Sequence, residues 1–127
     1  MEKIYKVKST GRGFFRMYVA IMSIQNPISK LRRQEREVLA EVMYQNYTIS
    51  KDYVNPEDPK KWRELFSYER KREMSEHSGN LSEASFANCL TALRKQGILD
   101  RDNYLHSALR VYPEKENVVS FKFLMQE

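Results

Sequence analysis

The clearest pattern in the chain lies between Ser82 and Leu99, where apolar and polar residues alternate with a helical period. Its apolar residues are Phe86, Cys89, Leu90 and Leu93. The residues that fall opposite them, at about 100° per residue, are Ala84, Asn88, Thr91 and Lys95. This spacing predicts a helix with one buried face and one small, nearly neutral outer face. Ser82 is the expected N-cap, and Gly97 is expected to end the helix.

Two earlier segments also have a helical pattern. A helix is expected from Lys30 to about Tyr47, with Ser29 as its N-cap. Its buried face is predicted to contain Leu31, Val38, Leu39 and Val42. A second helix is expected to start near Asp58, with Trp62, Leu65 and Phe66 in the core. A break near Ser67 that divides it into two short helices fits the pattern as well as one long helix does.

Both ends of the chain favour strands. Residues 3–8 and Phe14–Ile24, separated by the glycine-containing turn Ser9–Gly13, predict an N-terminal β-hairpin, because the second segment is rich in aromatic and β-branched residues. Residues 104–113 and 118–125 alternate loosely around the polar tip Glu114–Asn117, and they predict a second hairpin.

The stretch from Arg72 to Leu99 resembles the helix-turn-helix signature of many bacterial and phage regulators. The matching positions are Glu73, Met74, Ser75, Gly79, Leu81, Ser82, Phe86, Leu90, Leu93, Lys95, Gly97, Ile98 and Leu99. The resemblance covers roughly residues 68–125. It implies an α+β fold, a winged helix-turn-helix with a three-helix core and a C-terminal β-hairpin wing. We therefore expect a winged-helix domain over residues 29–127, preceded by an N-terminal β-hairpin extension over residues 1–28.

The resemblance implies that the helix over residues 82–96 enters the major groove of duplex DNA. An α-helix fits this groove, where the base edges present a distinguishable pattern of donors and acceptors. The candidate DNA-binding residues on this helix are Ser82, Glu83, Ala84, Ser85, Asn88, Thr91, Arg94 and Lys95. Arg70, Lys71 and Arg72 are candidates for phosphate contacts, and Lys115 is the only cation at the expected wing tip. Arg12, in the Ser9–Gly13 turn, is either a second basic finger or part of a plain hairpin loop.

Composition favours some partners and compartments over others, but it excludes few classes of function. The net charge of +5 favours a polyanionic partner, although ordinary solvated charges explain it equally well. With one cysteine, Cys89, the chain forms no internal disulfide, which favours a reducing compartment. We expect a cytoplasmic protein, associated with the nucleoid or, if phage-encoded, in the host cytoplasm, with no membrane partner. Isolated histidines and the lack of a glycine-rich phosphate motif predict no enzyme activity, no cofactor and no metal site.

Three hypotheses about function remain open at this stage. The first is a duplex DNA-binding protein, most simply a transcriptional regulator, in which a homodimer would use the apolar Phe14–Ile24 segment. The second is a protein-interaction module that binds an RNA polymerase subunit or a phage virion or assembly component, which suits the acidic loop Asp52–Asp58. The third is a binder of single-stranded nucleic acid that stacks bases on Tyr5, Tyr18 or Tyr104.

Overall fold

The computed structural model describes residues 2–8, 11–113 and 118–124, and the account of side chains below covers residues 11–113. Over all the described residues there are five α-helices and two strands. In chain order they are β1 (Glu2–Lys8), α1 (Gly11–Met22), α2 (Arg33–Ser50), α3 (Pro59–Leu65), α4 (Tyr68–His77), α5 (Glu83–Lys95) and β2 (Val118–Leu124). Short 3₁₀ helices occupy Ile28–Lys30 and Ser107–Leu109.

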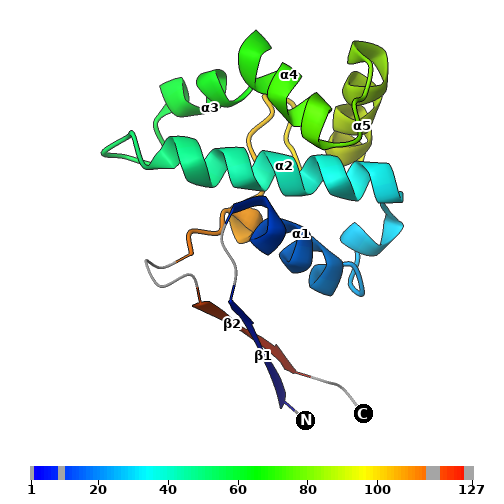
Figure 1. The fold of residues 1–127 in the computed structure, drawn as a ribbon, viewed down its shortest axis with the longest axis vertical. Helices are drawn as coiled ribbons and strands as arrows, with labels where there is room; N and C mark the ends of the chain where they lie inside the picture. Colours follow the sequence, from blue (N-terminus) through cyan, green and yellow to red (C-terminus); the bar gives the residue numbers. More distant parts are fainter. Residues whose placement is uncertain (1, 9–10, 114–117, 125–127) are drawn as a thin grey trace.

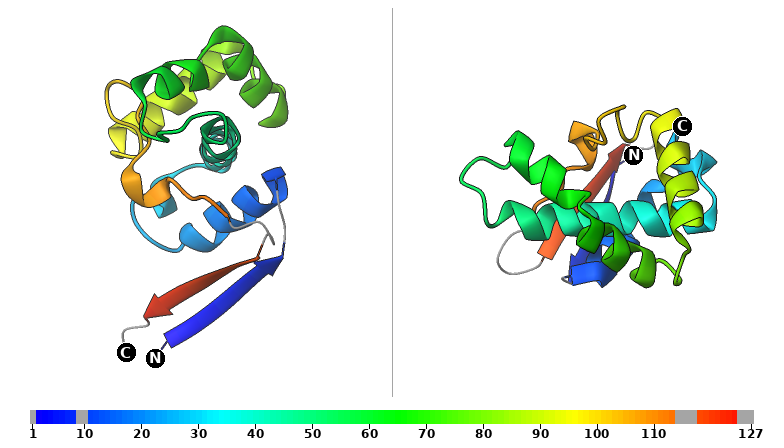
Figure 2. Two further views of the ribbon diagram at one scale, coloured as in Figure 1. Left: turned by 90° about the vertical axis from the view of Figure 1, so that its left-hand side faces the viewer. Right: turned by 90° about the horizontal axis from the view of Figure 1, so that it is seen from above.

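Helix α2 is the centre of the fold. In Figure 1 it crosses the molecule between α1 on one side and α3, α4 and α5 on the other, and in the left view of Figure 2 it lies end-on among them. Its buried apolar residues are Val38, Leu39, Ala40, Val42, Met43 and Ile49. They point in most directions around the helix axis, as expected for a helix that is covered on several sides.

Local sequence explains where the later helices begin and end. The Asp58 side chain accepts a hydrogen bond from the backbone N–H of Lys60, and Pro59 occupies the first turn of α3. Ser67 caps α4 in the same way, so the structure decides between the two alternatives left open by the sequence in favour of two short helices with a break near Ser67. Helix α5 begins after Ser82 and is followed by Gly97, which has a positive φ of 73°, as predicted.

The start of α2 differs from the prediction. Ser29 lies inside the 3₁₀ turn Ile28–Lys30 and its hydroxyl bonds to the Asn26 side chain, so it does not cap the helix. Arg32 is the N-cap residue instead, and its backbone N–H donates to the Glu35 carboxylate at 2.8 Å. The helix therefore begins at Arg33 and extends to Ser50.

The predicted α+β winged helix is wrong, and the N-terminal hairpin is the first reason. Residues 14–22, expected as a strand, belong to α1, and they pack against α2 within the same core as the rest of the helices. Phe14 and Phe15 are fully buried and Val19 almost so. Most of the apolar side chains that suggested a dimerisation strand therefore pack inside one chain, whereas Met17 and Ile24 are exposed.

The predicted C-terminal wing is also wrong. Strand β2 pairs antiparallel with β1, from Glu2 opposite Leu124 to Lys8 opposite Val118, and not with residues 104–113. The two strands form a ribbon that extends away from the helices in Figure 1. The described β-structure thus joins the two ends of the chain and does not form a wing beside α5. The expected tip, Glu114–Asn117 with Lys115, lies outside the described residues.

The segment after α5 packs back on the helices with only a short 3₁₀ helix and one isolated β-bridge as regular structure. Leu99 and Leu105 form an isolated antiparallel bridge, and Leu105 and Leu109 are buried. The Tyr104 ring stacks on Trp62 of α3, with centroids 5.0 Å apart and an interplanar angle of 17°. These contacts fix the chain that leaves α5 against the opposite end of the helical body.

Candidate functional site

Helix α5 is held by a tight turn and a capped first residue. Gly79 and Asn80 both have positive φ, 95° and 54°, and they reverse the chain between α4 and α5. The Ser82 hydroxyl then accepts the backbone N–H of Ser85 at 3.1 Å. This cap satisfies one of the amide groups that an open helix end leaves unpaired. The direction of α5 is therefore set by local backbone geometry.

The two faces of α5 are divided as the sequence predicted. The buried residues are Phe86, Cys89, Leu90 and Leu93. The exposed residues are Glu83 in the first turn, followed by Ala84, Ala87, Asn88, Thr91 and Lys95. The buried face packs on α2 and α4, and burial raises the pKa of the Cys89 thiol, which disfavours its reactive thiolate. We call the exposed set the outer face of α5.

The polar side chains at the edge of the outer face are partly engaged. The Thr91 hydroxyl donates to the Ala87 carbonyl at 3.1 Å and accepts from Arg94 at the same distance. Arg94 also donates to the Asn103 side chain at 2.6 Å, in the chain after α5. Arg94 thus ties the end of α5 to that segment. Asn88 and Lys95 have no side-chain hydrogen bond or ion pair within the described residues, so their polar groups face solvent.

The predicted phosphate-binding triplet on α4 is split by the structure. Arg70 points back toward α2, where it donates to Gln45 at 2.8 Å and lies 4.0 Å from Glu73. Arg72 is exposed and pairs with Glu76 one turn later at 3.3 Å. Lys71 is exposed without an ion pair in the described part of the chain. Of the three residues, Lys71 and Arg72 face outward, and Arg70 is structural.

Lys71 and Arg72 line a groove between α4 and α5 with a volume of about 500 Å³. Asn80 and Ala87, which sequence reasoning passed over, lie on its other side. Asn80 has a positive φ and is exposed at the turn between α4 and α5. The Gly79-Asn80 pair is a turn signal, and it is the sequence feature by which this residue could have been found. The groove places two cations of α4 beside the first turns of α5.

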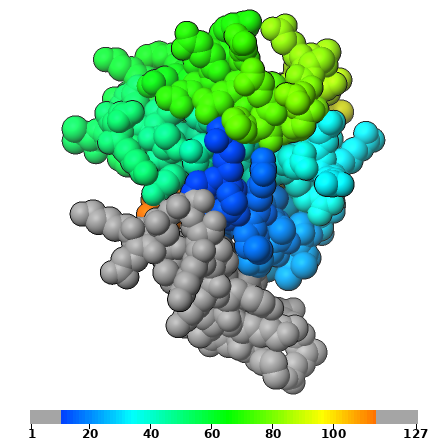
Figure 3. Space-filling view, in the orientation of Figure 1, coloured from blue at the N-terminus to red at the C-terminus, as the bar shows by residue number. Residues whose placement is uncertain are grey.

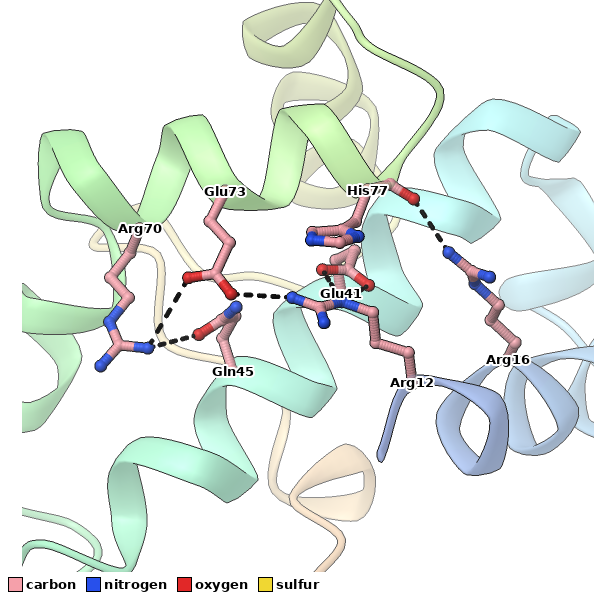
Figure 4. A network of polar contacts seen from close by, with 7 residues as sticks. All are labelled: Arg12, Arg16, Glu41, Gln45, Arg70, Glu73 and His77. Atoms are coloured by element: carbon pink, nitrogen blue, oxygen red, sulfur yellow. Dashed lines mark hydrogen bonds and ion pairs between the residues drawn. The ribbon is translucent and has the colours of Figure 1, made fainter. Parts of the chain in front are cut away.

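A polar network fixes α4 against α1 and α2, as shown in Figure 4. The Arg12 Nε atom lies 3.1 Å from both carboxylate oxygens of Glu41, and its Nη2 atom donates to Glu73 at 2.8 Å. Glu41 is 1% exposed; burial raises its pKa, and the hydrogen bond from Arg12 acts in the opposite direction. Arg12 also lies over the Tyr44 ring at 4.6 Å. Arg12 is therefore part of the helix junction and not a basic finger.

The short loop after α5 carries one further exposed cation. The Asp100 side chain accepts the backbone N–H groups of Asp102 and Tyr104, and Asn103 has a φ of 63°. These bonds order the loop between the bridged residues and leave Arg101 exposed at its tip. The turn residues Asp and Asn mark this loop in the sequence, directly after the predicted end of the helix at Gly97.

Comparison with known proteins does not assign this arrangement to a family. No family model matches the chain, and neither a curated protein nor a solved structure gives a significant match. Among the described helices, none is both long enough and apolar enough to cross a membrane. The candidate site therefore has to be judged on its own residues.

Proposed function

We propose that the protein binds duplex DNA, with the outer face of α5 in the major groove, and that it acts as a transcriptional regulator. One observation carries the proposal. Helix α5 has a firmly buried inner face and an outer face of small or hydrogen-bonding residues. A helix of this kind allows its backbone to approach base edges closely.

Asn88 is the residue best suited to contact a base. It lies in the middle of the outer face, is exposed, and makes no side-chain hydrogen bond within the described residues. A carboxamide is able to donate and accept at once, and it pairs with the N6 and N7 atoms of adenine. Alanines at positions 84 and 87 leave room around it and contribute methyl groups for contact with thymine.

The cations around α5 support electrostatic attraction to the phosphate backbone. Lys71 lies across the groove from α5, Lys95 in its last turn and Arg101 just beyond it. Glu83, and Asp100 and Asp102 on either side of Arg101, offset part of this charge. Glu83 lies in the first turn of α5, where a carboxylate interacts favourably with the helix dipole. Arg70 and Arg94 are engaged within the protein and are left out of the proposed contact set.

The test is selection of binding sites from a random duplex library, followed by affinity measurements at about 50 mM and about 200 mM salt. The test variant is Asn88→Ala/Lys95→Ala. The control is Lys60→Ala on α3, which removes the same charge from an exposed residue away from α5. We expect the wild type and the control to prefer the selected site over random duplex.

Loss of the Asn88 contact should reduce the preference for the selected site by about 5- to 150-fold, the range for a bidentate contact to a base. An absence of duplex binding at low salt would overturn the proposal and favour a protein partner instead. Unchanged site preference in the test variant would exclude α5 as the reading element.

A further inference from the structure

A second groove, between α1 and α2, contains three arginines. It has a volume of about 410 Å³, and the charged residues along it are Arg16 of α1 and Arg33, Arg36 and Glu37 of α2. Its remaining lining residues are small or apolar: Val19, Ala20, Ser23 and Ala40. We call it the arginine groove. Its three cations and single carboxylate give it a net positive charge.

The arginines of the groove are only partly paired. Arg33 lies 3.7 Å from Glu37, but its side chain is 92% exposed, so this ion pair contributes little. Arg36 has no ion pair in the described part of the chain, and its Nε atom is buried without a hydrogen-bond partner there. A buried guanidinium N–H without an acceptor is unfavourable. The exposed Arg33 guanidinium is accessible to an anion that enters the groove.

The arginine groove adjoins the turn that leads into α5. The Arg16 Nη2 atom donates to the His77 carbonyl at the end of α4, at 2.9 Å (Figure 4). A Cβ atom placed on Gly79 would lie 4.0 Å from the Glu37 carboxylate. Figure 3 shows α1 (blue) below α4 (green), with the N-terminal part of α2 (cyan) beside them. A polyanion at the first turn of α5 would therefore lie near this groove.

We propose that the arginine groove binds a phosphate group of the DNA backbone whose bases face α5. This inference rests on the proposed function. The planar guanidinium fork matches two phosphate oxygens, which a lysine ammonium does not, and all three cations of the groove are arginines. The apolar floor lowers the local dielectric and so strengthens the contact. The groove then positions α5 along the duplex without reading sequence.

The experiment compares the salt dependence of duplex binding in three proteins. The test variant, Arg33→Gln/Arg36→Gln, lowers the charge of the groove by two. The control, Lys60→Gln/Arg63→Gln, removes two exposed charges from α3. Each lost phosphate contact lowers the slope of log K against log salt by about 0.9. With one phosphate held by the groove, we expect the wild type and the control to lose about 3.5-fold more affinity than the test variant between about 50 and 200 mM salt.

The outcomes separate this proposal from the one on α5. Duplex binding with equal salt slopes in all three proteins overturns the groove and leaves α5 untouched. A reduced slope in the test variant supports the groove as a phosphate site. If Asn88→Ala/Lys95→Ala also leaves site preference unchanged, the phosphate contact stands, but its placement beside bases read by α5 is overturned. No duplex binding overturns both. Displacement of the duplex by poly-glutamate as effectively as by polyphosphate of equal charge would assign the groove to an acidic peptide and overturn the proposal.

Discussion

Lys61 is a buried amine whose ionisation should control stability at alkaline pH. The residue lies on α3 and is 0% exposed, its Nζ atom donates to the Asn46 side chain at 2.7 Å, and it lies 3.7 Å from the centroid of the Trp62 ring. Burial lowers the pKa of the Lys61 ammonium from 10.5 to about 8; the Glu57 charge opposes this shift and Arg110 adds to it.

The sign of the effect follows from these two pKa values. Between pH 8 and 10.5 the unfolded chain still holds a proton at Lys61 that the folded chain has released. The free energy of unfolding therefore rises with pH in this window. Integrated from about pH 7 to about pH 10, the gain from Lys61 is about 2–3 kcal/mol.

The assay is urea unfolding of the wild type and Lys61→Met at pH values from about 7 to about 10. Methionine keeps the unbranched chain and removes the charge, so other titrating groups cancel in the difference between the two proteins. We expect the free energy of unfolding of the wild type to rise by about 2–3 kcal/mol more than that of the variant over this range. Lys60→Met, at the exposed neighbouring position, should run parallel to the wild type. A constant difference between wild type and Lys61→Met would refute the reasoning.

Two further predictions concern the helix junction and the end of α5. Glu41→Gln should destabilise the fold by about 3 kcal/mol, because it leaves Arg12 without its buried partner. A double-mutant cycle with Arg12→Met should give a coupling energy of more than about 0.5 kcal/mol. Additive effects of the two substitutions would contradict this prediction. Gly97→Ala should cost at least about 1 kcal/mol through its positive φ alone, since nothing lies within 4 Å of the added carbon. Gly13→Ala, inside α1, should instead raise the melting temperature, and equal shifts for both glycines would refute the backbone argument.

The two proposals share a physical requirement, which is that α4 and α5 keep their places on α2. The Arg12–Glu41–Glu73 contacts join three helices at the side of the molecule where the arginine groove lies. Glu41→Gln is therefore expected to affect DNA binding only through folding. Binding measured at a temperature where the variant remains folded would separate the two effects.

The site was more predictable than the fold around it. The division of α5 into a buried face and an exposed face follows from spacing alone, because a helix repeats every 3.6 residues whatever it packs against. The roles of Arg70 and Arg94 did not follow, because the partners Gln45 and Asn103 lie on other segments. In the sequence, Arg70 and Arg94 look like any other exposed cation. Only the folded structure distinguishes these two, which bind other side chains, from Lys71 and Lys95, which face solvent.

The largest error concerned residues 14–22. Aromatic and β-branched residues favour a strand on composition, yet Phe14 with Tyr18 and Phe15 with Val19 recur at four-residue spacing. That helical spacing was present and outweighs propensity once α2 offers a surface to pack against. The strand that this segment was expected to supply comes from β2 instead, more than a hundred residues away from β1 in the chain.

The sequence by itself determined α5 with its cap at Ser82, a helix start near Asp58, and the apolar faces of α2 and α5. All of these depend on interactions within a few residues. The sequence left open whether one helix or two follow Asp58. Only the tertiary structure decided that α1 is a helix, that the two ends of the chain pair as a ribbon, and that Lys61 and Glu41 are buried. The physical reason is that pairing and burial depend on segments far apart in the chain, and a single sequence carries no local record of which segments meet.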